Sequence, residues 1–444
     1  FSEASSECSR SLWTSYAGPP ITLWEWTTVR AARATARRYA GPVLHISGAW
    51  QRTARGAGLL SPDGSLAPTI FAEITAAAVR HDAVNLGQGF PDEDGPREVL
   101  DAATDAIRSG VNQYPPGRGM PVLRDAIADH QHRFYGIDLD PDREILVTAG
   151  ATEALTAALL ALLGDPTDEV VVFEPYYDSY AAAIALAGAR LVPVPLRWPA
   201  LEPDLDELRA AVTDRTRIIL VNDPHNPTGT VFSRDVRDEI VRLAEQHDAL
   251  IVTDEVYEHL VMDTPHTPIS TVPGAADRTL TISSGGKTFR TTGWKIGWVS
   301  GPADLVDAVL SVKQYLTYVN GAPFQPAIAV GLGLPDIYFE DLAATQRERR
   351  DLLGAGLVAA GFDVSTPAGS YFTVADVRSL LAPDEDAADF CRALPGRVGV
   401  AAIPVTAFVT AEHREQYATL VRFAACKRTD VIAEAAGRLA ASAR

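Results

Sequence analysis

The chain has 444 residues, of which 47% are hydrophobic and 22% charged, which is the ordinary profile of a soluble globular protein. Its formal net charge of −18 argues against nucleic acid as a partner, because polyphosphate would be repelled, and no apolar run approaches the roughly 18 residues of a membrane helix. Cys8, Cys391 and Cys426 have neither metal-type nor disulfide-type spacing, which favours a reducing compartment, so we expect a cytoplasmic protein that uses neither membrane nor nucleic acid.

Residues 1–57 differ in composition from the rest of the chain. They contain seven arginines against three glutamates, together with four of the seven tryptophans. Because the apolar residues show no sustained period, we predict a poorly ordered N-terminal extension. An Arg-rich, acid-poor start could indicate an organelle transit peptide, but a non-native upstream stretch is the favoured interpretation.

Between residues 144 and 302, short β-branched runs alternate with helical patterns such as ATEALTAALLALLG (151–164). Most of the runs are continuously apolar, which is typical of strands buried on both faces of a mainly parallel sheet. We therefore predict an α/β, three-layer large domain with a mainly parallel seven-stranded sheet. The seven runs are EILVTAG (144–150), EVVVFEP (169–175), ARLVPVPL (189–196), RIILVNDP (217–224), ALIVTDEV (249–256), TLTISSGG (279–286) and IGWVSGP (296–302).

Beyond residue 330 the pattern changes to a helix, three short strands and a second helix. The strands are predicted at YFTVADV (371–377), VGVAAIPV (398–405) and LVRFAACK (420–427). This order indicates a smaller α+β domain.

Polar side chains follow the predicted strands at their carboxyl ends, where ligands bind in open parallel sheets. In TAGATEAL (148–155), a tight turn and a helix start would expose amides beside the Thr152 hydroxyl and form a cup for one phosphate. For Thr152 alone, an ordinary helix N-cap is the favoured interpretation. In VNDPHNPTGTVF (221–232), two X-Pro units end the strand and aim Asn226 outward, although the motif also suits a plain turn.

Two further strand ends carry charged residues. LIVTDEVYEHL (250–260) ends a buried strand on Asp254, with Tyr257 on the same side if a helical turn begins; a helix N-cap is the alternative for this carboxylate. SSGGKTFRTTGWKIGW (283–298) places Lys287 at the mouth of another strand. Most lysines are solvated surface charges, yet in a dry cleft the pKa of Lys287 would fall and its free amine could react with a carbonyl. Lys295 would then supply a point charge for a phosphate.

These groups together describe a pocket for a phosphorylated, pyridine-bearing aromatic aldehyde. The stretch from about residue 60 to 440 resembles the fold-type I, class I/II aminotransferases that use pyridoxal 5′-phosphate (PLP). Within that family it is most similar to the kynurenine, methionine and N-succinyldiaminopimelate aminotransferase branch. The resemblance rests on eight blocks in family order: NLGQGFPDEDGP (85–96), NQYPPGRG (112–119), VTAGATEAL (147–155), FEPYYDSY (173–180), PHNPTGTVFS (224–233), TDEVYEHL (253–260), KTFRTTGWKIGW (287–298) and LVRFAACKR (420–428).

The resemblance implies a division of the chain. It covers about residues 60–440, so that 58–95 would contribute to the small domain, 96–325 would form the large PLP-binding domain and 326–444 the small C-terminal domain.

The resemblance also assigns residues to the cofactor ring. Lys287 matches the catalytic lysine that carries the cofactor and moves the proton at the substrate, and Asp254 matches the residue that pairs with the pyridinium nitrogen. Asn226 and Tyr257 match the groups that bond the 3-oxygen of the ring. Tyr177, rather than Tyr176, matches the aromatic residue that stacks on it.

The remaining matches concern the phosphate and the substrate. The phosphate would be held by four groups, the amides of Ala151 and Thr152, Ser284 and Lys295. Tyr114 matches a tyrosine that reaches the phosphate from the other subunit, which implies a homodimer with shared active sites. Arg422 matches the arginine that grips the substrate α-carboxylate, with Gly89 and Asn226 beside it.

Some positions depart from the family pattern or carry less chemistry. Gly285-Gly286 precede the lysine where the family has a bulkier residue and a serine, which puts the aim of Lys287 in doubt, and Lys295 stands where arginine is commoner. His130 and His132 face different ways on a helix, so no metal site is expected. Arg118 and Arg290 would suit a distal substrate carboxylate, but a solvated role is favoured.

The sequence therefore predicts an amino-acid:2-oxo-acid transaminase. Resemblance alone favours an N-succinyldiaminopimelate type, of lysine and cell-wall biosynthesis, with glutamate and 2-oxoglutarate as one pair. The alternative is a kynurenine, methionine or glutamine type with cysteine-conjugate β-lyase activity. A transcription regulator with an aminotransferase-like body would need a DNA-binding head of roughly 60 to 70 residues, and residues 1–57 show no helix-turn-helix pattern.

Overall fold

The computed structural model describes residues 48–61 and 63–442 of the chain, so most of the predicted extension, residues 1–47, lies outside the described part. For the last part of the predicted extension, residues 49–56, the prediction of poor order is wrong. Ala49–Gly56 form helix α2, which packs against α7 (Ser179–Ala187). The Arg52 guanidinium donates to the carbonyls of Ala185 (2.7 Å) and Leu186 (3.2 Å) at the carboxyl end of α7, where a cation is favourable. This order comes from tertiary contact, which local composition does not report.

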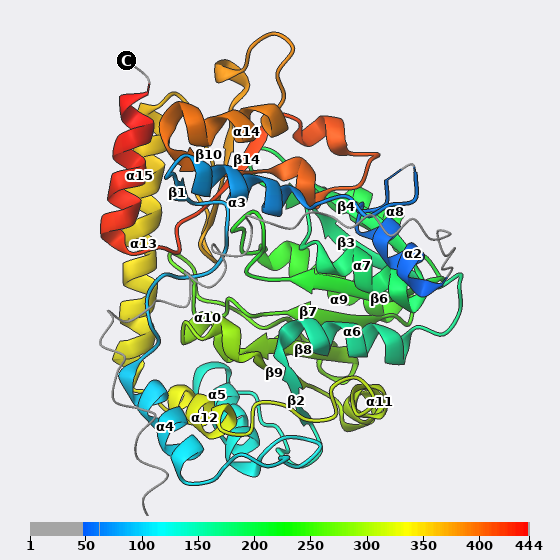
Figure 1. Ribbon diagram of the computed structural model, residues 1–444. Helices are drawn as coiled ribbons and strands as arrows, with labels where there is room; N and C mark the ends of the chain where they lie inside the picture. The colour runs from blue at the N-terminus through cyan, green and yellow to red at the C-terminus, as the bar shows by residue number, and fades with distance from the viewer. Residues whose placement is uncertain (1–47, 62, 443–444) are drawn as a thin grey trace, which may run out of the picture. The chain divides into compact units, whose positions relative to one another are not determined.

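The centre of the molecule is an eight-stranded sheet in the order β2-β9-β8-β7-β6-β3-β4-β5 (Figure 1). The pairs among β4, β3, β6, β7 and β8 are parallel, whereas β9 runs antiparallel to both of its neighbours. The prediction of a mainly parallel sheet is confirmed, but the strand number was one too low, because β5 has two residues and gives no periodic signal. The strands are β2 (Ile145–Ala149), β3 (Glu169–Glu174), β4 (Arg190–Arg197), β5 (Glu202–Pro203), β6 (Thr216–Asn222), β7 (Leu250–Asp254), β8 (Thr279–Ser284) and β9 (Ile296–Ser300).

Helices cover both faces of this sheet, which explains the continuous apolar runs. On β3, for example, Val170 and Val172 pack into one hydrophobic cluster while Val171 and Phe173 pack into another. The first face is covered by α6 (Gly150–Leu162), α7 and α11 (Ala303–Lys313). The second face is covered by α8 (Leu205–Ala211) and α9 (Arg234–Gln246) at one end, and by α4 (Arg97–Arg108), α5 (Pro121–Tyr135) and α12 (Phe324–Leu332) at the β2–β9 end.

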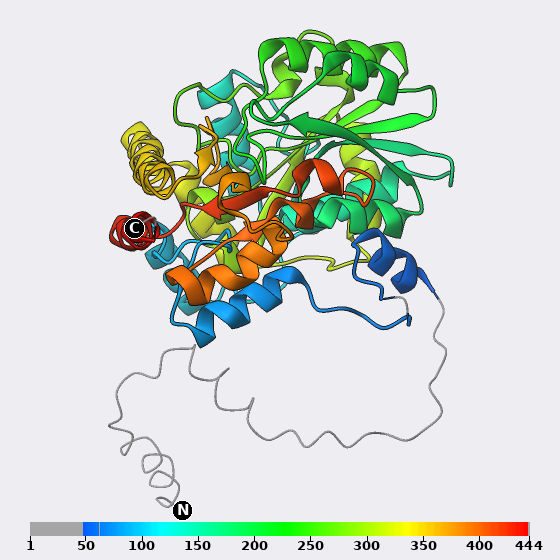
Figure 2. The ribbon, with the colours of Figure 1, turned by 90° about the horizontal axis from the view of Figure 1, so that it is seen from above.

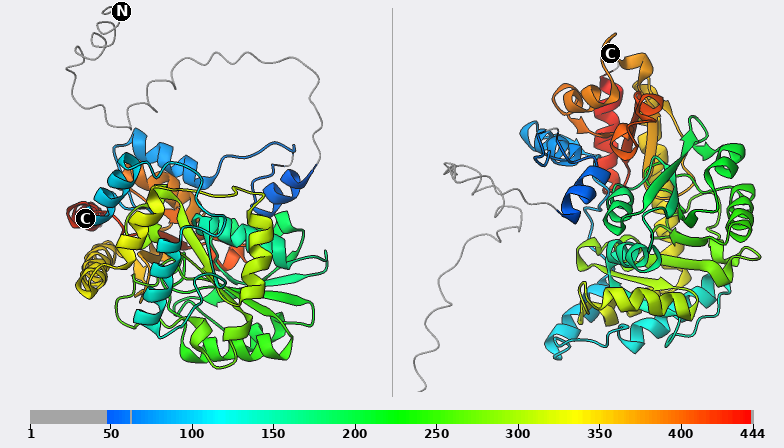
Figure 3. Two further views of the ribbon diagram at one scale, coloured as in Figure 1. Left: turned by 90° about the horizontal axis from the view of Figure 1, so that it is seen from below. Right: turned by 90° about the vertical axis from the view of Figure 1, so that its right-hand side faces the viewer.

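A second hydrophobic core belongs to a smaller lobe built from both ends of the described chain. Its four-stranded antiparallel sheet has the order β10-β11-β14-β13, and β1 pairs in parallel with β12. Figure 2 shows the long α13 and α15 side by side, and Figure 3 (right panel) shows the orange and red elements of this lobe grouped together. The elements are α3 (Ile70–Arg80), β1 (Val84–Asn85), α13 (Asp336–Ala359), β10 (Asp363–Val364), β11 (Phe372–Asp376), α14 (Ala387–Val398), β12 (Val400–Ala401), β13 (Ile403–Pro404), β14 (Leu420–Ala424) and α15 (Thr429–Ala441).

The predicted domain boundaries stay predictions, although two packing facts bear on them. α3 and β1 contribute to the core of the smaller lobe. α12 begins at Phe324, close to the boundary predicted at 325/326, and packs against α4 and α5 of the larger part. Among the described residues, no helix combines the length and the apolar character needed to cross a bilayer.

Candidate active site

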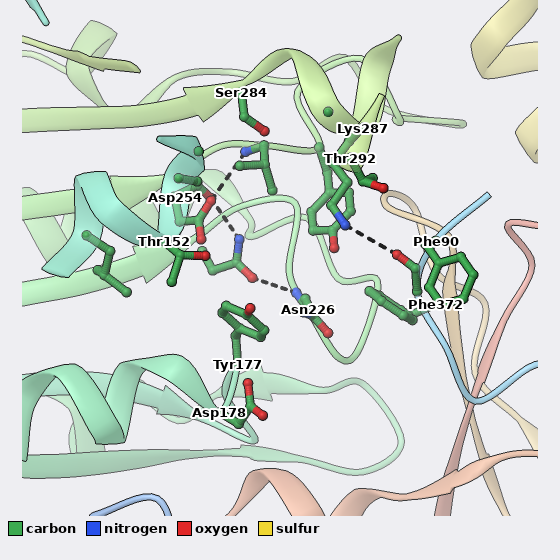
Figure 4. Close-up of a pocket in the computed structure, with 18 of the residues that line it drawn as sticks. Phe90, Thr152, Tyr177, Asp178, Asn226, Asp254, Ser284, Lys287, Thr292 and Phe372 are labelled. Carbon is green, nitrogen blue, oxygen red and sulfur yellow. Dashed lines mark hydrogen bonds between the residues drawn. The ribbon is translucent and has the colours of Figure 1, made fainter. Parts of the chain in front are cut away.

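A cavity of about 540 Å³ opens at the carboxyl ends of the parallel strands. The predicted site residues that line it are Gly89, Ala151, Thr152, Tyr177, Asn226, Asp254, Tyr257, Ser284, Lys287, Lys295 and Arg422. Figure 4 shows Lys287, Asp254, Asn226 and Tyr177 around this one space. Tyr114 is not among the lining residues; its side chain is 83% exposed and lies edge-on to Tyr318, with ring centroids 5.8 Å apart.

Lys287 lies on the single turn of α10 (Gly285–Thr288), directly after β8. Its Nζ donates to the Tyr371 hydroxyl (2.9 Å) and to the Gly89 carbonyl (3.2 Å). Burial lowers the pKa of the amine to about 8, so near neutral pH a usable fraction of it is unprotonated. Gly285 fits this position, because a Cβ there would lie 2.7 Å from the Ile328 side chain, whereas a Cβ on Gly286 would lie 3.2 Å from the Thr292 Cα.

Asp254 is the last residue of β7 and is nearly fully buried. Its Oδ2 accepts from the Tyr180 hydroxyl (2.8 Å), and Asn222 Nδ2 donates to its backbone carbonyl (2.7 Å). Burial raises the pKa of this carboxyl to about 6. No helix begins here, so the N-cap alternative does not apply, and within the described residues no basic side chain forms an ion pair with it. A buried carboxylate without an ion-pair partner is stabilised when a cation binds to it.

A cup of backbone amides and one lysine forms the far wall of the cavity. Helix α6 begins at Gly150, which has φ +75°, and its first-turn amides have no acceptor within the helix. The N-cap position is Ala149, so the N-cap interpretation of Thr152 is wrong: it lies within the first turn. The Lys295 ammonium lies 3.3 Å from the point that a Cβ on Gly150 would occupy. Amides at a helix start beside an ammonium form a receptor for an anion.

Close backbone packing holds this cup together. Gly297 at the start of β9 lies against the turn so tightly that a Cβ there would be 2.6 Å from the Gly150 carbonyl carbon. Ser284, the last residue of β8, lines the same wall. Glycine is therefore required at position 297 for the cup to keep its form.

Arg422 reaches the cavity from β14 of the smaller lobe and is clamped between two aromatic rings. Its guanidinium carbon lies 4.2 Å from the ring centre of Phe372 and 4.6 Å from that of Phe408. Nη2 donates to the Gly87 carbonyl (2.7 Å) and Nη1 to Asn226 Oδ1 (3.2 Å), while Nε has no partner among the described atoms. Burial lowers its pKa to about 10, so it stays charged at neutral pH and can bind a carboxylate.

Two tyrosines border the space between Asp254 and the cup. Tyr177 lines the cavity and lies edge-on to Tyr180. Tyr176 instead is buried, and its backbone N–H donates to the Phe408 carbonyl (2.8 Å). Tyr257 is 3% exposed, burial raises its pKa, and its ring is edge-on to Tyr371.

Several residues of the site were missed by the sequence interpretation. Tyr371 binds Lys287, Tyr180 binds Asp254, and the rings of Phe372 and Phe408 hold Arg422. Tyr180 stands in FEPYYDSY, one of the eight blocks that carry the resemblance, so its place in the sequence already indicated a role near the site. Phe372 opens β11 of the smaller lobe and Tyr371 directly precedes it, so in the sequence both looked like ordinary core residues.

The remaining candidates lie outside the main cavity. Arg118 pairs with Asp307, and Arg290 pairs with Glu93 (3.3 Å). Of the cysteines, Cys391 and Cys426 are free and buried, and Cys8 lies outside the described residues.

The fold brings His130 next to residues that the sequence did not pair with it. His130, Glu258 and His259 place ligand-type atoms within 4.8 Å of one another. The two histidine Nε2 atoms are 2.7 Å apart, a hydrogen-bond distance, whereas two ligands of a tetrahedral zinc at 2.0–2.1 Å stand roughly 3.3 Å apart. The Ser283 hydroxyl also donates to Glu258 (2.7 Å), so the cluster is bonded internally as it stands.

Comparison with known proteins agrees with this geometry. The sequence profile of aminotransferase class I and II matches residues 81–439. The N-succinyldiaminopimelate aminotransferase structure from Mycobacterium tuberculosis is 51% identical, with a TM-score of 0.81 over 85% of this chain and 97% of that one. The methionine aminotransferase of Escherichia coli is 37% identical over 84% of this chain and 96% of its own length. The human kynurenine–oxoglutarate transaminase 3 is 36% identical over 82% and 86%, respectively.

Proposed function

The chain belongs to the class I and II aminotransferases, and from this premise we propose that its cavity holds PLP and that Lys287 carries the cofactor. As a member of the family the protein is a transferase that moves an amino group between an amino acid and a 2-oxo acid. The family is PLP-dependent, and what is proposed for this chain is the assignment of individual residues and substrates.

The observation that carries the proposal is that three groups in one cavity complement three parts of PLP: its ring nitrogen, its aldehyde and its phosphate. The buried Asp254 has a pKa raised to about 6 and favours a cation, which the protonated pyridine nitrogen of PLP is. The amine of Lys287 has a pKa lowered to about 8 and suits an aldehyde. The amide cup at Gly150–Thr152 with Lys295 suits a phosphate.

Bound there, the cofactor would act as a sink for the electron pair released when a bond to the substrate Cα breaks. Lys287 Nζ would take up the proton from the substrate Cα and deliver it to the carbon that was the aldehyde carbon of the cofactor. Asp254 would hold a proton at the ring nitrogen, with Tyr180 fixing the carboxylate. Asn226 and Tyr257 would orient the ring through its 3-oxygen, and Tyr177 would lie against its face.

Arg422 would fix the substrate by its α-carboxylate. The guanidinium is held by its aromatic clamp and by the Gly87 carbonyl, so little freedom remains to be lost when the carboxylate binds. Its unpartnered Nε supplies a donor for that carboxylate, with Gly89 and Asn226 beside it.

Tyr114 is proposed to complete the cup of a second subunit. The residue lies outside the cavity of its own chain and is largely exposed, which leaves it available to a partner. A homodimer with shared active sites follows from this proposal. A cytoplasmic location stays a prediction.

For the substrates we propose N-succinyldiaminopimelate with glutamate and 2-oxoglutarate as the second pair. The support is the 51% identity to the mycobacterial enzyme of that name. A kynurenine, methionine or glutamine type with cysteine-conjugate β-lyase activity is the second candidate. Four phenylalanines line the cavity and would suit an apolar or aromatic side chain, namely Phe71, Phe90, Phe372 and Phe408.

A substrate panel tests the choice between these candidates. Purified enzyme with PLP is given 2-oxoglutarate and each amino donor in turn, and glutamate formation is measured. The highest kcat/KM for N-succinyldiaminopimelate supports the first candidate, and a higher value for methionine or kynurenine supports the second. Release of pyruvate and ammonia from a cysteine conjugate without added oxo acid marks the β-lyase. The Lys287→Ala variant should show none of these activities.

A further inference from the structure

The connection between α11 and α12 crosses behind the amide cup and is bonded to it at two points. At the first point, the Thr317 N–H and hydroxyl donate to Glu153 Oε1 (3.2 Å and 2.5 Å). The other oxygen of this carboxylate accepts the Ala149 N–H (2.6 Å). Glu153, in the first turn of α6, therefore links the connection to the residue that precedes the cup.

At the second point, Asn320 bridges the two sides of the cup. Its Nδ2 donates to the Thr148 carbonyl on β2 (3.2 Å) and to the Lys295 carbonyl (3.0 Å). Lys295 has φ +54°, a left-handed conformation that a lysine adopts only when its surroundings hold it. The amide of Asn320 thus supports the backbone from which the ammonium of Lys295 extends towards Gly150.

We propose that Asn320 is a positioning residue for phosphate binding: it fixes Lys295 and the α6 turn relative to each other, with Thr317 and Glu153 supporting the same geometry. This inference rests on the proposed function, because the anion concerned is the cofactor phosphate. Asn320 is absent from the lining of the cavity and acts through the two backbones that it joins. The pairing of strands β2 and β9 ends at Ala149 and Ile296, and the two bonds of Asn320 extend this link to Lys295, so their loss would loosen the ammonium relative to the amides.

The start of α12 joins the same connection to the loop that carries Tyr114. Gln325 donates to the Asn320 carbonyl (2.7 Å), and its other amide atom accepts the Met120 N–H (2.7 Å). The ring of Tyr318 lies against that of Tyr114. In the proposed homodimer, a disturbance at Asn320 would therefore reach the cup of its own subunit and the tyrosine offered to the partner.

The test measures anion affinity directly. Cofactor-free protein is titrated with PLP, followed by visible absorbance, and inorganic phosphate is used as a competitor to report on the cup alone. Asn320→Ala loses two neutral hydrogen bonds. The affinities for PLP and for phosphate should therefore both fall by the same factor, roughly 5- to 30-fold. Lys287→Ala should weaken PLP while leaving phosphate affinity unchanged. The matched control is Gln314→Ala. This exposed amide of the same connection bonds, among the described residues, the Ser311 carbonyl alone (3.3 Å), so neither the PLP affinity nor the phosphate affinity should change.

Two further variants separate positioning from a structural role. Asn320→Asp keeps the shape of the side chain but presents an oxygen to two carbonyls, so it should bind phosphate no better than Asn320→Ala. Thr317→Val removes one hydroxyl bond to Glu153 and should weaken phosphate by roughly 3- to 10-fold even if the Asn320 variants fail to fold.

The outcomes are distinguishable. Restored affinity in Asn320→Asp, or unchanged phosphate affinity in both Asn320→Ala and Thr317→Val, would overturn the inference. A lower unfolding midpoint with unchanged anion affinity would do the same. If wild-type protein takes up no PLP, the proposed function fails instead.

Discussion

Replacing Asp254 with asparagine should stabilise the cofactor-free protein at neutral pH, although it removes the carboxylate that we propose to pair with the ring nitrogen of PLP. Burial raises the pKa of this carboxyl from 3.8 to about 6. The folded state therefore gains stability from the protonated form below pH 3.8 and loses it as the pH rises through 6. The full shift corresponds to about 3 kcal/mol, of which about 1 kcal/mol is offset because asparagine offers one acceptor fewer to the Tyr180 hydroxyl and the Val256 N–H.

The assay is urea denaturation of the cofactor-free wild type and Asp254→Asn at two pH values. We expect the variant to be more stable by about 2 kcal/mol at pH 7.5, and this advantage to be smaller by about 1.5 kcal/mol at pH 5.0, since the lost acceptor contributes equally at both. With PLP bound the order should reverse, because the carboxylate then has its cation. A variant that is less stable than wild type by the same amount at both pH values would refute the argument.

Three further substitutions probe other parts of the cavity. Tyr371→Phe removes an acceptor from the Lys287 ammonium, so the pKa of the amine should fall from about 8 by about one unit. The pH midpoint of PLP uptake, followed by visible absorbance, should fall with it, and an upward shift of that midpoint would contradict the expectation. Arg422→Lys loses the planar fork that binds a carboxylate, and kcat/KM for the amino acid should drop by ~100-fold or more at unchanged PLP absorbance; a smaller loss than tenfold would mean that the carboxylate binds elsewhere. Gly297→Ala places a methyl group 2.6 Å from the backbone of the cup and should weaken PLP by ~10-fold or more in equilibrium dialysis, whereas Gly293→Ala, with no atom within 4 Å, should have no effect.

Much of the fold could be read from the sequence because the central strands are buried on both faces. A run such as EVVVFEP carries apolar residues at the four inner positions of β3, Val170 to Phe173, and both helical layers need them. The polar residues at the ends of such runs were then expected to converge, and Asp254 and Lys287 do line one cavity. The two-residue β5 and the short α2 left no comparable pattern.

The parts that escaped the sequence depend on contacts between distant segments. Tyr371 is 84 residues from the lysine that it binds, and nothing near it signals that contact. The rings that clamp Arg422 come from two further segments of the smaller lobe. For Thr152, the misreading arose because the residue preferred at N-caps stands three positions further along, inside the first turn.

The reversed direction of β9 has a consequence for how the enzyme can change. Since β8 ends and β9 begins at the same end of the sheet, the connection between them carries both lysines: Lys287 near its start, on α10, and Lys295 as its last residue. The lysine proposed to carry PLP and the lysine proposed to bind its phosphate therefore lie on one connection between two paired strands, which fixes their separation. A substitution within that connection can change the position of one lysine alone, whereas an inserted or deleted residue would change the distance between the two.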